Sequence, residues 1–434
     1  MKRGILFKII TSFFLVLLVY RLPAAETYSL DDCIETALKN NYGIVAAKNS
    51  YDAARGEVYT AWGGLLPTIS ISANGSRNWP IFARFDESSG QIISGRDRFS
   101  SSLNFSNSFP GMGLYNYANI KKKRNDRNSS FYYFVKSQKD LILGVKGYYY
   151  DLLKSKMLLE VAEEAVKRGE ERLRVVQSRY DLGSASMSDV LKAKVRYGSD
   201  RLDLVSKSNI FKLAKAQLAY TMGIDVNNDF EVDENLPERD IDISFEGGFS
   251  EALSGNPEYR KAIFDLSSAK NSKTMAYSNF LPTLSLGLSH SSNVYEFSQF
   301  TEFKQANASS FMYASLSFNI FNGTSDYATL LAAKKNVDTN NHALKDTKNR
   351  VALEVKQAFL DIEQSNEARK LADESVAAAQ EDLNLVKEKY NLGAATILEV
   401  LDAEVSLKQA QTSKVQAIFD NNLAISKLEK VLGR

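Results

Sequence analysis

The chain has 434 residues, a formal charge of +2 and a charged fraction of 24%. A nucleic-acid-binding protein needs a clustered excess of basic residues, so this near balance of charge argues against that class. The single cysteine, Cys33, excludes an internal disulfide. The sequence has two histidines, His290 and His342, and no nucleophile or phosphate-loop motif. We therefore expect neither an enzyme nor a bound cofactor.

The first 25 residues have the pattern of a secretory signal. Lys2, Arg3 and Lys8 precede an apolar run over 9–20, and small residues suited to cleavage follow up to Ala25. The run is too short for a membrane-spanning helix, and nothing later approaches roughly 18 consecutive apolar residues. We therefore expect an exported chain in the periplasm, the outer membrane or the medium.

Two stretches that contain Leu-Pro-Thr predict amphipathic strands. LLPTISISANGSRNW begins at Leu65 and FLPTLSLGLSHSSNVY begins at Phe280, and later partners end at Phe109 and Phe321. All four alternate apolar with polar residues and carry aromatic residues near their ends. We expect strands near 67–78, 99–109, 282–294 and 310–321, with outward-facing loops over 80–98 and 291–309.

Strands of this length with one apolar face are typical of an outer-membrane barrel wall. Four strands cannot close a barrel, because the smallest known barrels have about eight. A small soluble sheet that caps the helices is the alternative. An exported chain with helices too long for one core favours a barrel shared by several chains, so we expect an oligomer.

Helix breakers are absent from Thr324 to Leu392. At about 1.5 Å per residue, a helix over this stretch would be on the order of 100 Å long. Apolar residues such as Val355, Phe359 and Ile362 recur at coiled-coil-like spacing, which indicates packing against another long helix. A similar segment stands 210 residues earlier. Each half is therefore expected to contain a long helix, a glycine and a second helix.

The glycine in each half belongs to a repeated motif. YDLGSASMSDVLKAK, which begins at Tyr180, recurs 210 residues later as YNLGAATILEVLDAE, with seven of fifteen positions identical. We expect Gly183 and Gly393 to end a helix in the left-handed conformation. Ser186 and Thr396 would start the next helix, each with a carboxylate three residues on. The motif therefore predicts the tip of a helical hairpin.

The repeat divides the chain into a predicted signal and two similar halves, each with a helix, two strands and a long helical hairpin. The acidic linker between the halves includes DVNNDFEVDENL, which is similar to a calcium loop. Phe230 stands where such a loop needs Gly, and Leu236 where it needs the bidentate Glu. The predicted segments are a signal over 1–25, a first repeat over 26–223, the linker over 224–248 and a second repeat over 249–434.

Together these elements resemble the TolC family of outer-membrane efflux proteins. The resemblance is carried by YSLDDCIETALKNNYGI near the N-terminus, both Leu-Pro-Thr starts, both Tyr-x-Leu-Gly tips and the closing VLG. It implies an α+β membrane protein in which three protomers each give four strands to one twelve-stranded outer-membrane barrel. The long helices would continue the barrel as a periplasmic tunnel. The implied function is export of substrates from a periplasmic or inner-membrane pump, in a tripartite efflux or type I secretion complex.

The resemblance also implies partners. These are two further copies of the chain, a periplasmic adaptor, an inner-membrane pump and outer-membrane lipid, with no nucleic acid. A secreted or periplasmic coiled-coil scaffold without a barrel is the alternative, but it leaves the strands unexplained. The adaptor would contact both hairpin tips, at Leu182, Gly183, Ser184, Leu392, Gly393 and Ala394.

The resemblance further implies a periplasmic gate at the inner end of the tunnel. Its residues would be Glu399 and Asp402, just past the second tip, together with Tyr390 and Asp189. The basic residue that helps to clamp the closed state in well-studied members falls on Ala395 here. The resemblance therefore implies the acidic constriction in this chain more strongly than it implies the ionic clamp.

The predicted gate carboxylates differ in how well capping explains them. Glu399 can be the capping-box partner of Thr396, where a carboxylate is stabilised by the helix N-terminus. Asp402 lies beyond the first turn but on the same face, and Asp189 can pair with Lys192. In a trimer, six crowded carboxylates would repel one another, which would raise their pKa values and favour bound cations.

Overall fold

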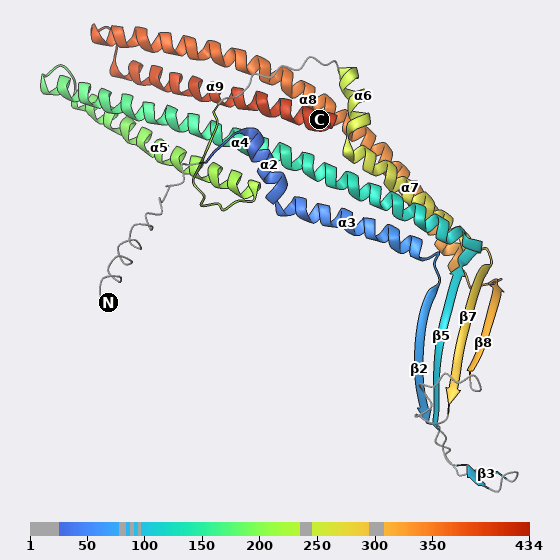
Figure 1. Ribbon diagram of the computed structural model, residues 1–434. Helices are drawn as coiled ribbons and strands as arrows, with labels where there is room; N and C mark the ends of the chain where they lie inside the picture. The colour runs from blue at the N-terminus through green and yellow to red at the C-terminus, as the bar shows by residue number, and fades with distance from the viewer. Residues whose placement is uncertain (1–25, 78–83, 87–90, 94–96, 235–244, 295–307) are drawn as a thin grey trace, which may run out of the picture. The chain divides into compact units, whose positions relative to one another are not determined.

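The computed structural model describes most of the chain beyond its first 25 residues (Figure 1). The predicted signal over 1–25 lies outside the described residues, as do parts of the loops expected over 80–98 and 291–309. Among the described residues, no helix combines the length and the apolar character that crossing a membrane requires. The described ranges are 26–77, 84–86, 91–93, 97–234, 245–294 and 308–434.

The chain divides into two compact units, each assembled from separate stretches of sequence. The hairpin unit, which contains both predicted tips, comprises Met1–Ile44, Gln138–Ile243 and Gln357–Lys430. The sheet unit comprises Val45–Ser137, Ser244–Lys356 and Val431–Arg434. Both units therefore draw on both predicted repeats, whose boundaries remain a prediction.

Four antiparallel strands form the main sheet of the sheet unit, in the order β2-β5-β7-β8 (Figure 1). All four strands that the sequence predicts are present, which follows from their alternating patterns. Their bounds are Thr68–Arg77 for β2, Asp97–Phe109 for β5, Thr283–Val294 for β7 and Ala308–Ser317 for β8.

The fourth strand is shorter than predicted, because it ends at Ser317 and not at 321. Ser317 pairs with Thr283, the first residue of β7. Pro282 precedes Thr283 and has no backbone N–H to offer the ladder. Residues 318–321 therefore lose their strand partner although their alternating pattern continues.

The loop expected over 80–98 is partly strand. β3 (Arg84–Asp86) pairs antiparallel with β4 (Gln91–Ile93), and β5 already begins at Asp97. The other expected loop, over 291–309, also loses residues at both ends to β7 and β8. The direction in which these loops face remains a prediction.

Side chains alternate between the two faces of the sheet, so residues that pair across neighbouring strands form rows on one face. One row across all four strands is apolar, and a row on the opposite face consists of serines. In the serine row, the hydroxyls of Ser72 and Ser102 lie 2.8 Å apart, and those of Ser291 and Ser309 lie 3.2 Å apart. The apolar row is Ile69, Phe105, Leu288 and Met312, and the serine row is Ser72, Ser102, Ser291 and Ser309.

Helices account for the rest of the sheet unit. α7 begins where Asn256 caps it and Pro257 occupies its first turn, a position where a missing N–H costs nothing. The short 3-10 helix η1 leads from β5 into the long helix α4. The helices with residues in this unit are α3 (Tyr42–Gly63), η1 (Pro110–Gly113), α4 (Leu114–Asp181), α6 (Phe245–Gly255), α7 (Pro257–Ser278), α8 (Ser325–Asn391) and, by its last two residues, α9 (Ile397–Leu432).

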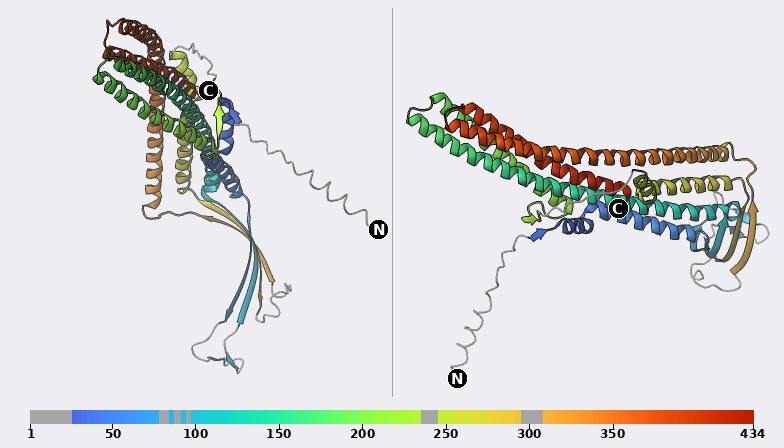
Figure 2. Two further views of the ribbon diagram at one scale, coloured as in Figure 1. Left: turned by 90° about the vertical axis from the view of Figure 1, so that its left-hand side faces the viewer. Right: turned by 90° about the horizontal axis from the view of Figure 1, so that it is seen from above.

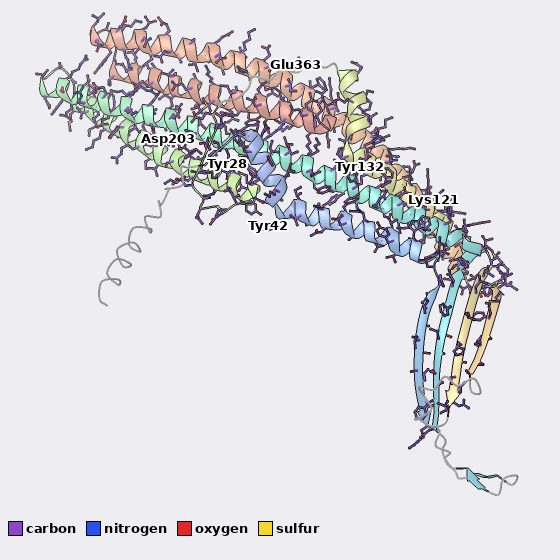
Figure 3. All side chains as sticks on the ribbon, viewed as in Figure 1. Tyr28, Tyr42, Lys121, Tyr132, Asp203 and Glu363 are labelled. Carbon is purple, nitrogen blue, oxygen red and sulfur yellow. The ribbon has the colours of Figure 1, made fainter. Side chains whose placement is uncertain are left out.

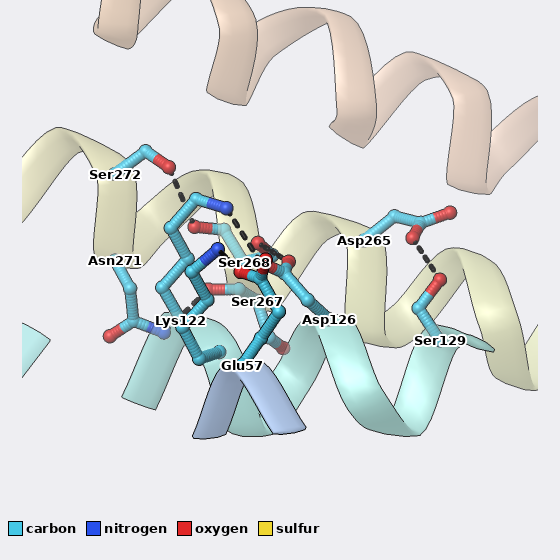
Figure 4. A network of polar contacts seen from close by, with 10 residues as sticks. Glu57, Lys122, Asp126, Ser129, Asp265, Ser267, Ser268, Asn271 and Ser272 are labelled. Carbon is cyan, nitrogen blue, oxygen red and sulfur yellow. Dashed lines mark hydrogen bonds and ion pairs between the residues drawn. The ribbon is translucent and has the colours of Figure 1, made fainter. Parts of the chain in front are cut away.

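Polar groups join α4 to α7. Ser129 on α4 donates to Asp265 on α7 at 2.5 Å, and Ser268 on α7 donates to Asp126 on α4 (Figure 4). Tyr132 on α4, which is labelled in Figure 3, stacks on Phe264 with 5.6 Å between ring centroids. Because the polar groups of this interface have partners, the two helices can pack closely without leaving donors unpaired.

The hairpin unit contains the two predicted hairpins, which run side by side in Figures 1 and 2. The first joins the end of α4 to α5 (Met187–Met222), and the second joins the end of α8 to α9 (Ile397–Leu432). Ion pairs connect the hairpins: Arg172 on α4 pairs with Glu404 on α9, and Lys408 on α9 lies 2.7 Å from Asp203 on α5.

A helix and a two-stranded sheet complete the hairpin unit. α2 (Leu30–Asn40) starts at a Ser29–Asp32 capping box, and β1 (Glu26–Tyr28) pairs in parallel with β6 (Phe230–Val232). The predicted linker over 224–248 is therefore partly structured, because Phe230 is buried and packs edge-on against Tyr28. α6 also begins inside the predicted linker.

Candidate functional site

The first hairpin turns at a glycine in the left-handed conformation, as the sequence predicts. Gly183 has a φ of 76°. Its N–H donates to the carbonyl of Tyr180 at 2.9 Å, and the N–H of Ser184 donates to the carbonyl of Arg179 at 2.8 Å. This pair of bonds is a Schellman cap, which satisfies carbonyls at the end of α4 that have no partner within the helix.

The second hairpin repeats this geometry. Gly393 has a φ of 77°, and its N–H donates to the carbonyl of Tyr390 at 3.2 Å. The N–H of Ala394 donates to the carbonyl of Lys389 at 2.8 Å. Both tips predicted from the repeated motif are therefore confirmed.

Both tips expose an apolar side chain beside an open backbone. Leu182 is 83% exposed and Leu392 is 84% exposed. A Cβ built on Gly183 or Gly393 would meet no atom within 4 Å. Each tip thus offers a leucine next to a stretch of backbone that another chain can approach closely.

Each second helix starts at a capping box. The carboxylate of Asp189 accepts from the N–H of Ser186 at 3.1 Å, and that of Glu399 accepts from the N–H of Thr396 at 3.1 Å. The hydroxyl in turn accepts from the backbone N–H of the acidic residue, at 3.2 Å in the first tip and 3.3 Å in the second. Glu399 is therefore the capping-box partner of Thr396, which is the alternative to a role in the gate.

These caps hold both carboxylates in the ionised form. Hydrogen bonds from the Ser186 hydroxyl and backbone lower the pKa of Asp189, and those from the Thr396 backbone and hydroxyl lower the pKa of Glu399. The pKa of Glu399 is thus lowered within the single chain. The increase in pKa that we expect from crowding would come from the carboxylates of the other two copies in a trimer.

Lys192 does not form the ion pair with Asp189 that the sequence suggests. Its charge contributes only a weaker attraction that lowers the pKa of Asp189. The carboxylate of Asp189 is instead directed to the cap, where it also accepts from the Ser186 hydroxyl at 2.8 Å. The direct Asp189–Lys192 ion pair is therefore not formed, although the charge of Lys192 partly offsets that of Asp189.

Asp402 is the unpaired acidic residue of the predicted gate. It is exposed on α9, and its carboxylate has no hydrogen bond or ion pair to any residue that the structure describes. Glu399 is also exposed, one turn earlier on the same helix. These two residues place negative charge just past the second tip.

Tyr390 has a partner that sequence reasoning missed. The guanidinium of Arg179, on α4, lies 4.3 Å from the centroid of the Tyr390 ring and donates to Asn391 Oδ1 at 3.2 Å. It also approaches the carbonyl of Tyr390, at 3.5 Å. The structure thus joins Tyr390 to the other hairpin through Arg179, and the described contacts do not join it to Asp189. The only signal in the sequence is that Arg179 directly precedes the first repeated motif.

The hairpins are also joined by ion pairs between buried side chains. The side chain of Arg172 is 8% exposed, and that of its partner Glu404 is 9% exposed. Burial lowers the pKa of Arg172 to about 10, which still leaves it charged at neutral pH. Lys408 similarly reaches buried Asp200 at 3.3 Å. Such pairs fix how α4, α5 and α9 align, because an unpaired buried charge is costly.

The described residues contain no group of three or more His, Cys, Asp or Glu side chains that could hold a metal ion. Cys33 is a free, buried thiol. Its pKa is raised to about 12 by burial, so it is a poor nucleophile. The arrangement at the tips is suited to contact with other chains and to electrostatic selection of ions.

Comparisons with known proteins place this architecture in a family. A family model described as outer membrane efflux protein matches residues 33–223 and 248–434. The pyoverdine export outer membrane protein OpmQ of Pseudomonas putida is 23% identical over 421 residues, which cover 93% of this chain and 85% of that protein.

Solved structures have the same fold. The Campylobacter jejuni CmeC outer membrane channel aligns with a TM-score of 0.84 and 20% identity, over 93% of this chain and 85% of that one. The Vibrio cholerae outer membrane protein VceC aligns with a TM-score of 0.83 and 18% identity, over 93% and 96%. The family favours the channel over the coiled-coil scaffold. The chain thus belongs to the outer membrane efflux protein family and is an efflux channel of the outer membrane.

Proposed function

We propose that three copies of the chain form a trimer whose twelve strands close one barrel in the outer membrane. The observation that carries this proposal is the pair of open sheet edges. In the part of the chain that the structure describes, β2 and β8 each have a single strand neighbour. Their outer backbone groups therefore need partners from another chain, because lipid satisfies none of them.

The exposed side chains of the sheet agree with contact to lipid. Ile71 on β2 is 81% exposed and Met312 on β8 is 84% exposed. Four strands are too few for closure, whereas three sets of four give an even number within the range of known barrels. Each β8 would pair with the β2 of the next copy, so that no edge remains.

Cross-linking in native outer membranes tests the assembly. Amine-reactive cross-linking should produce a ladder that ends at the trimer, and extraction should require detergent. A ladder that ends at the dimer would contradict the trimer. Release of the protein from membranes by salt alone would contradict the barrel and would favour the coiled-coil scaffold.

The gate of the tunnel is the second part of the proposal. Glu399 and Asp402 from three copies would place six carboxylates around the periplasmic end of the tunnel, with Tyr390 and Asp189 nearby. Support comes from the exposure of Asp402, which has no partner in the described chain, and from the caps that keep Glu399 ionised. Such a ring would select cations and bind polyvalent cations.

The hairpin tips are the third part of the proposal. We assign them to contact with a periplasmic adaptor that links the channel to an inner-membrane pump, since relatives are named as outer membrane components of efflux pumps. Exposed Leu182 and Leu392, each beside an open glycine, provide the contact surface. The role is transport, and no catalytic step is assigned to any residue.

A further inference from the structure

A pocket of about 420 Å³ lies between α4, α8 and α9 in the hairpin unit. A volume of this size is typical of sites for small organic molecules. Its apolar side is formed by Val176, Ile397 and Val400, which are buried. Its polar side carries four basic residues, which are Lys167, Arg168, Arg172 and Lys387.

The acidic residues of the pocket neutralise only part of this positive charge, and Arg168 pairs with Glu164 on its own helix at 3.1 Å. Glu171 pairs with Arg174 at 2.6 Å, and Glu404 pairs with Arg172. Lys167 and Lys387 have no ion pair or hydrogen bond to any residue in the described ranges. Two lysines thus face the pocket with their charges uncompensated.

Arg172 also has an unused donor. Its side chain is 8% exposed, and its Nε is buried without a hydrogen-bond partner in the described chain. A buried donor without a partner is uncommon in native proteins, because leaving it unpaired is costly. Since Arg172 lines the pocket, a small movement of its side chain would bring this enclosed donor to an acceptor bound there.

The electrostatic environment of Lys387 also favours a bound anion. Burial and the nearby charges of Arg168 and Arg172 lower the pKa of Lys387. A bound anion would offset both effects, because an opposite charge favours the protonated amine. Glu171 and Glu404 line the same pocket, but neither offsets these effects at Lys387.

We propose that this pocket binds a small organic anion, with a carboxylate or phosphate group on an apolar body. The anionic group would be held by Lys387 and Arg172, as charge-assisted hydrogen bonds require. The apolar body would lie on Val175, which also lines the pocket and is exposed, beside Ile397 and Val400. This site goes beyond the proposed export channel, whose assembly and acidic gate do not depend on it.

An occupant would border the contact between the hairpins. Tyr390 and Asn391 line the pocket, and both are partners of Arg179 on the first hairpin. A bound anion would therefore contact α4 and α8 at the level of this link. Binding would hold the two hairpins together more firmly.

Calorimetry on the full chain in detergent tests the site. The probe is 2-naphthoate, its neutral counterpart is 2-naphthamide, and inorganic phosphate is the anion without an apolar body, each corrected with protein-free micelles. We expect 2-naphthoate to bind at least about tenfold more tightly than either of the others. Equal binding of the acid and the amide, or no binding of the acid, would overturn the proposal. If inorganic phosphate bound as tightly as 2-naphthoate, the proposed contact with an apolar body would be wrong.

Two variants on α8 locate the site. Lys387→Met should weaken 2-naphthoate binding about tenfold or more. Lys370→Met makes the same change of charge on the same helix outside the pocket and should leave binding unchanged. Since neither lysine has a partner in the described chain, both variants should keep the circular dichroism and melting temperature of the parent chain. If Lys387→Met binds 2-naphthoate like the parent chain, the pocket is not the site.

Discussion

Arg179 on α4 and Tyr390 on α8 are in contact, with the guanidinium 4.3 Å from the ring centroid. Two further contacts of the same guanidinium, to Asn391 and to the Tyr390 carbonyl, tie the first hairpin to the second at its tip. The sequence has no basic residue at position 395, where the family resemblance places a clamp. A basic residue nevertheless reaches Tyr390, a residue of the proposed gate, from the other hairpin.

Replacing Arg179 should loosen this link. Arg179→Gln removes the cation from the ring, a contact worth about 0.5–1 kcal/mol at an exposed site. We expect a larger resting conductance in planar bilayers, by a factor of up to about five. The matched control is Arg174→Gln, since Arg174 is exposed and its ion pair among the described residues lies within its own helix, with Glu171. Equal conductance in the Arg179 variant and the parent channel would show that the link does not restrain the tunnel.

The cap of Glu399 should set the pH range of cation block. Its pKa is lowered from the ordinary value of 4.5, so the carboxylate stays charged at pH values where an ordinary glutamate becomes neutral. Block by a trivalent cation should therefore weaken as the pH falls through the pKa of Glu399, which the cap lowers and the crowding expected in a trimer raises. The stability that the cap contributes is lost over the same window, because the folded pKa lies below the unfolded one.

Removing the Thr396 hydroxyl should shift this window. Thr396→Val removes two of the hydrogen bonds of the cap, so the pKa of Glu399 rises towards its ordinary value and block is lost at a higher pH. Ser186→Val is the control, because it changes the cap of Asp189 on the other hairpin. Identical pH profiles for the parent chain and Thr396→Val would mean that Glu399 does not hold the blocking cation.

Bulk at the second tip should prevent export without preventing assembly. Gly393→Trp places a large side chain where the structure leaves open space, and would exclude an adaptor. Gly393→Ala carries the same backbone strain, of about 1–2 kcal/mol, without the bulk. We expect export to be abolished by tryptophan and retained with alanine, with trimers in both. Loss of export in both variants would assign the glycine to folding and would contradict the docking surface.

The buried pair of Arg172 and Glu404 should be essential for the stability of the hairpin unit. Arg172→Met leaves Glu404 buried without its partner, which costs about 3–5 kcal/mol for such pairs. Arg172→Met with Glu404→Leu should recover most of that loss, because two apolar side chains leave no buried charge. Thermal unfolding followed by circular dichroism measures both, and a stable single variant would contradict this account.

The hairpin tips could be predicted from sequence because their signals are local. Gly183 and Gly393 require a left-handed backbone, and Ser186 and Thr396 each stand three residues before a carboxylate, so the cap follows from neighbouring residues alone. The four strands likewise follow from alternation within short stretches.

Features that depend on distant partners could not be predicted. The contact of Arg179 with the Tyr390 backbone joins residues 211 positions apart. The early end of β8 depends on where β7 begins, and the burial of Phe230 depends on its pairing with the N-terminal strand. The grouping of Glu399 and Asp402 into a ring requires other copies of the chain, so it stays a prediction.

Single-channel recording in planar bilayers, with the purified trimer and Glu399→Ala/Asp402→Ala, tests the central claim most directly. The parent channel should be cation-selective and blocked by trivalent cations from the periplasmic side, because the six carboxylates of the proposed gate would face the narrow end. The double variant should lose the block and most of the selectivity, and widen the resting pore only modestly. Asp189→Ala should do much less, and Glu381→Ala, an exposed acidic control on α8, should change neither. Undiminished block in the double variant would contradict the acidic gate and would leave these carboxylates as caps and solvent-exposed charges.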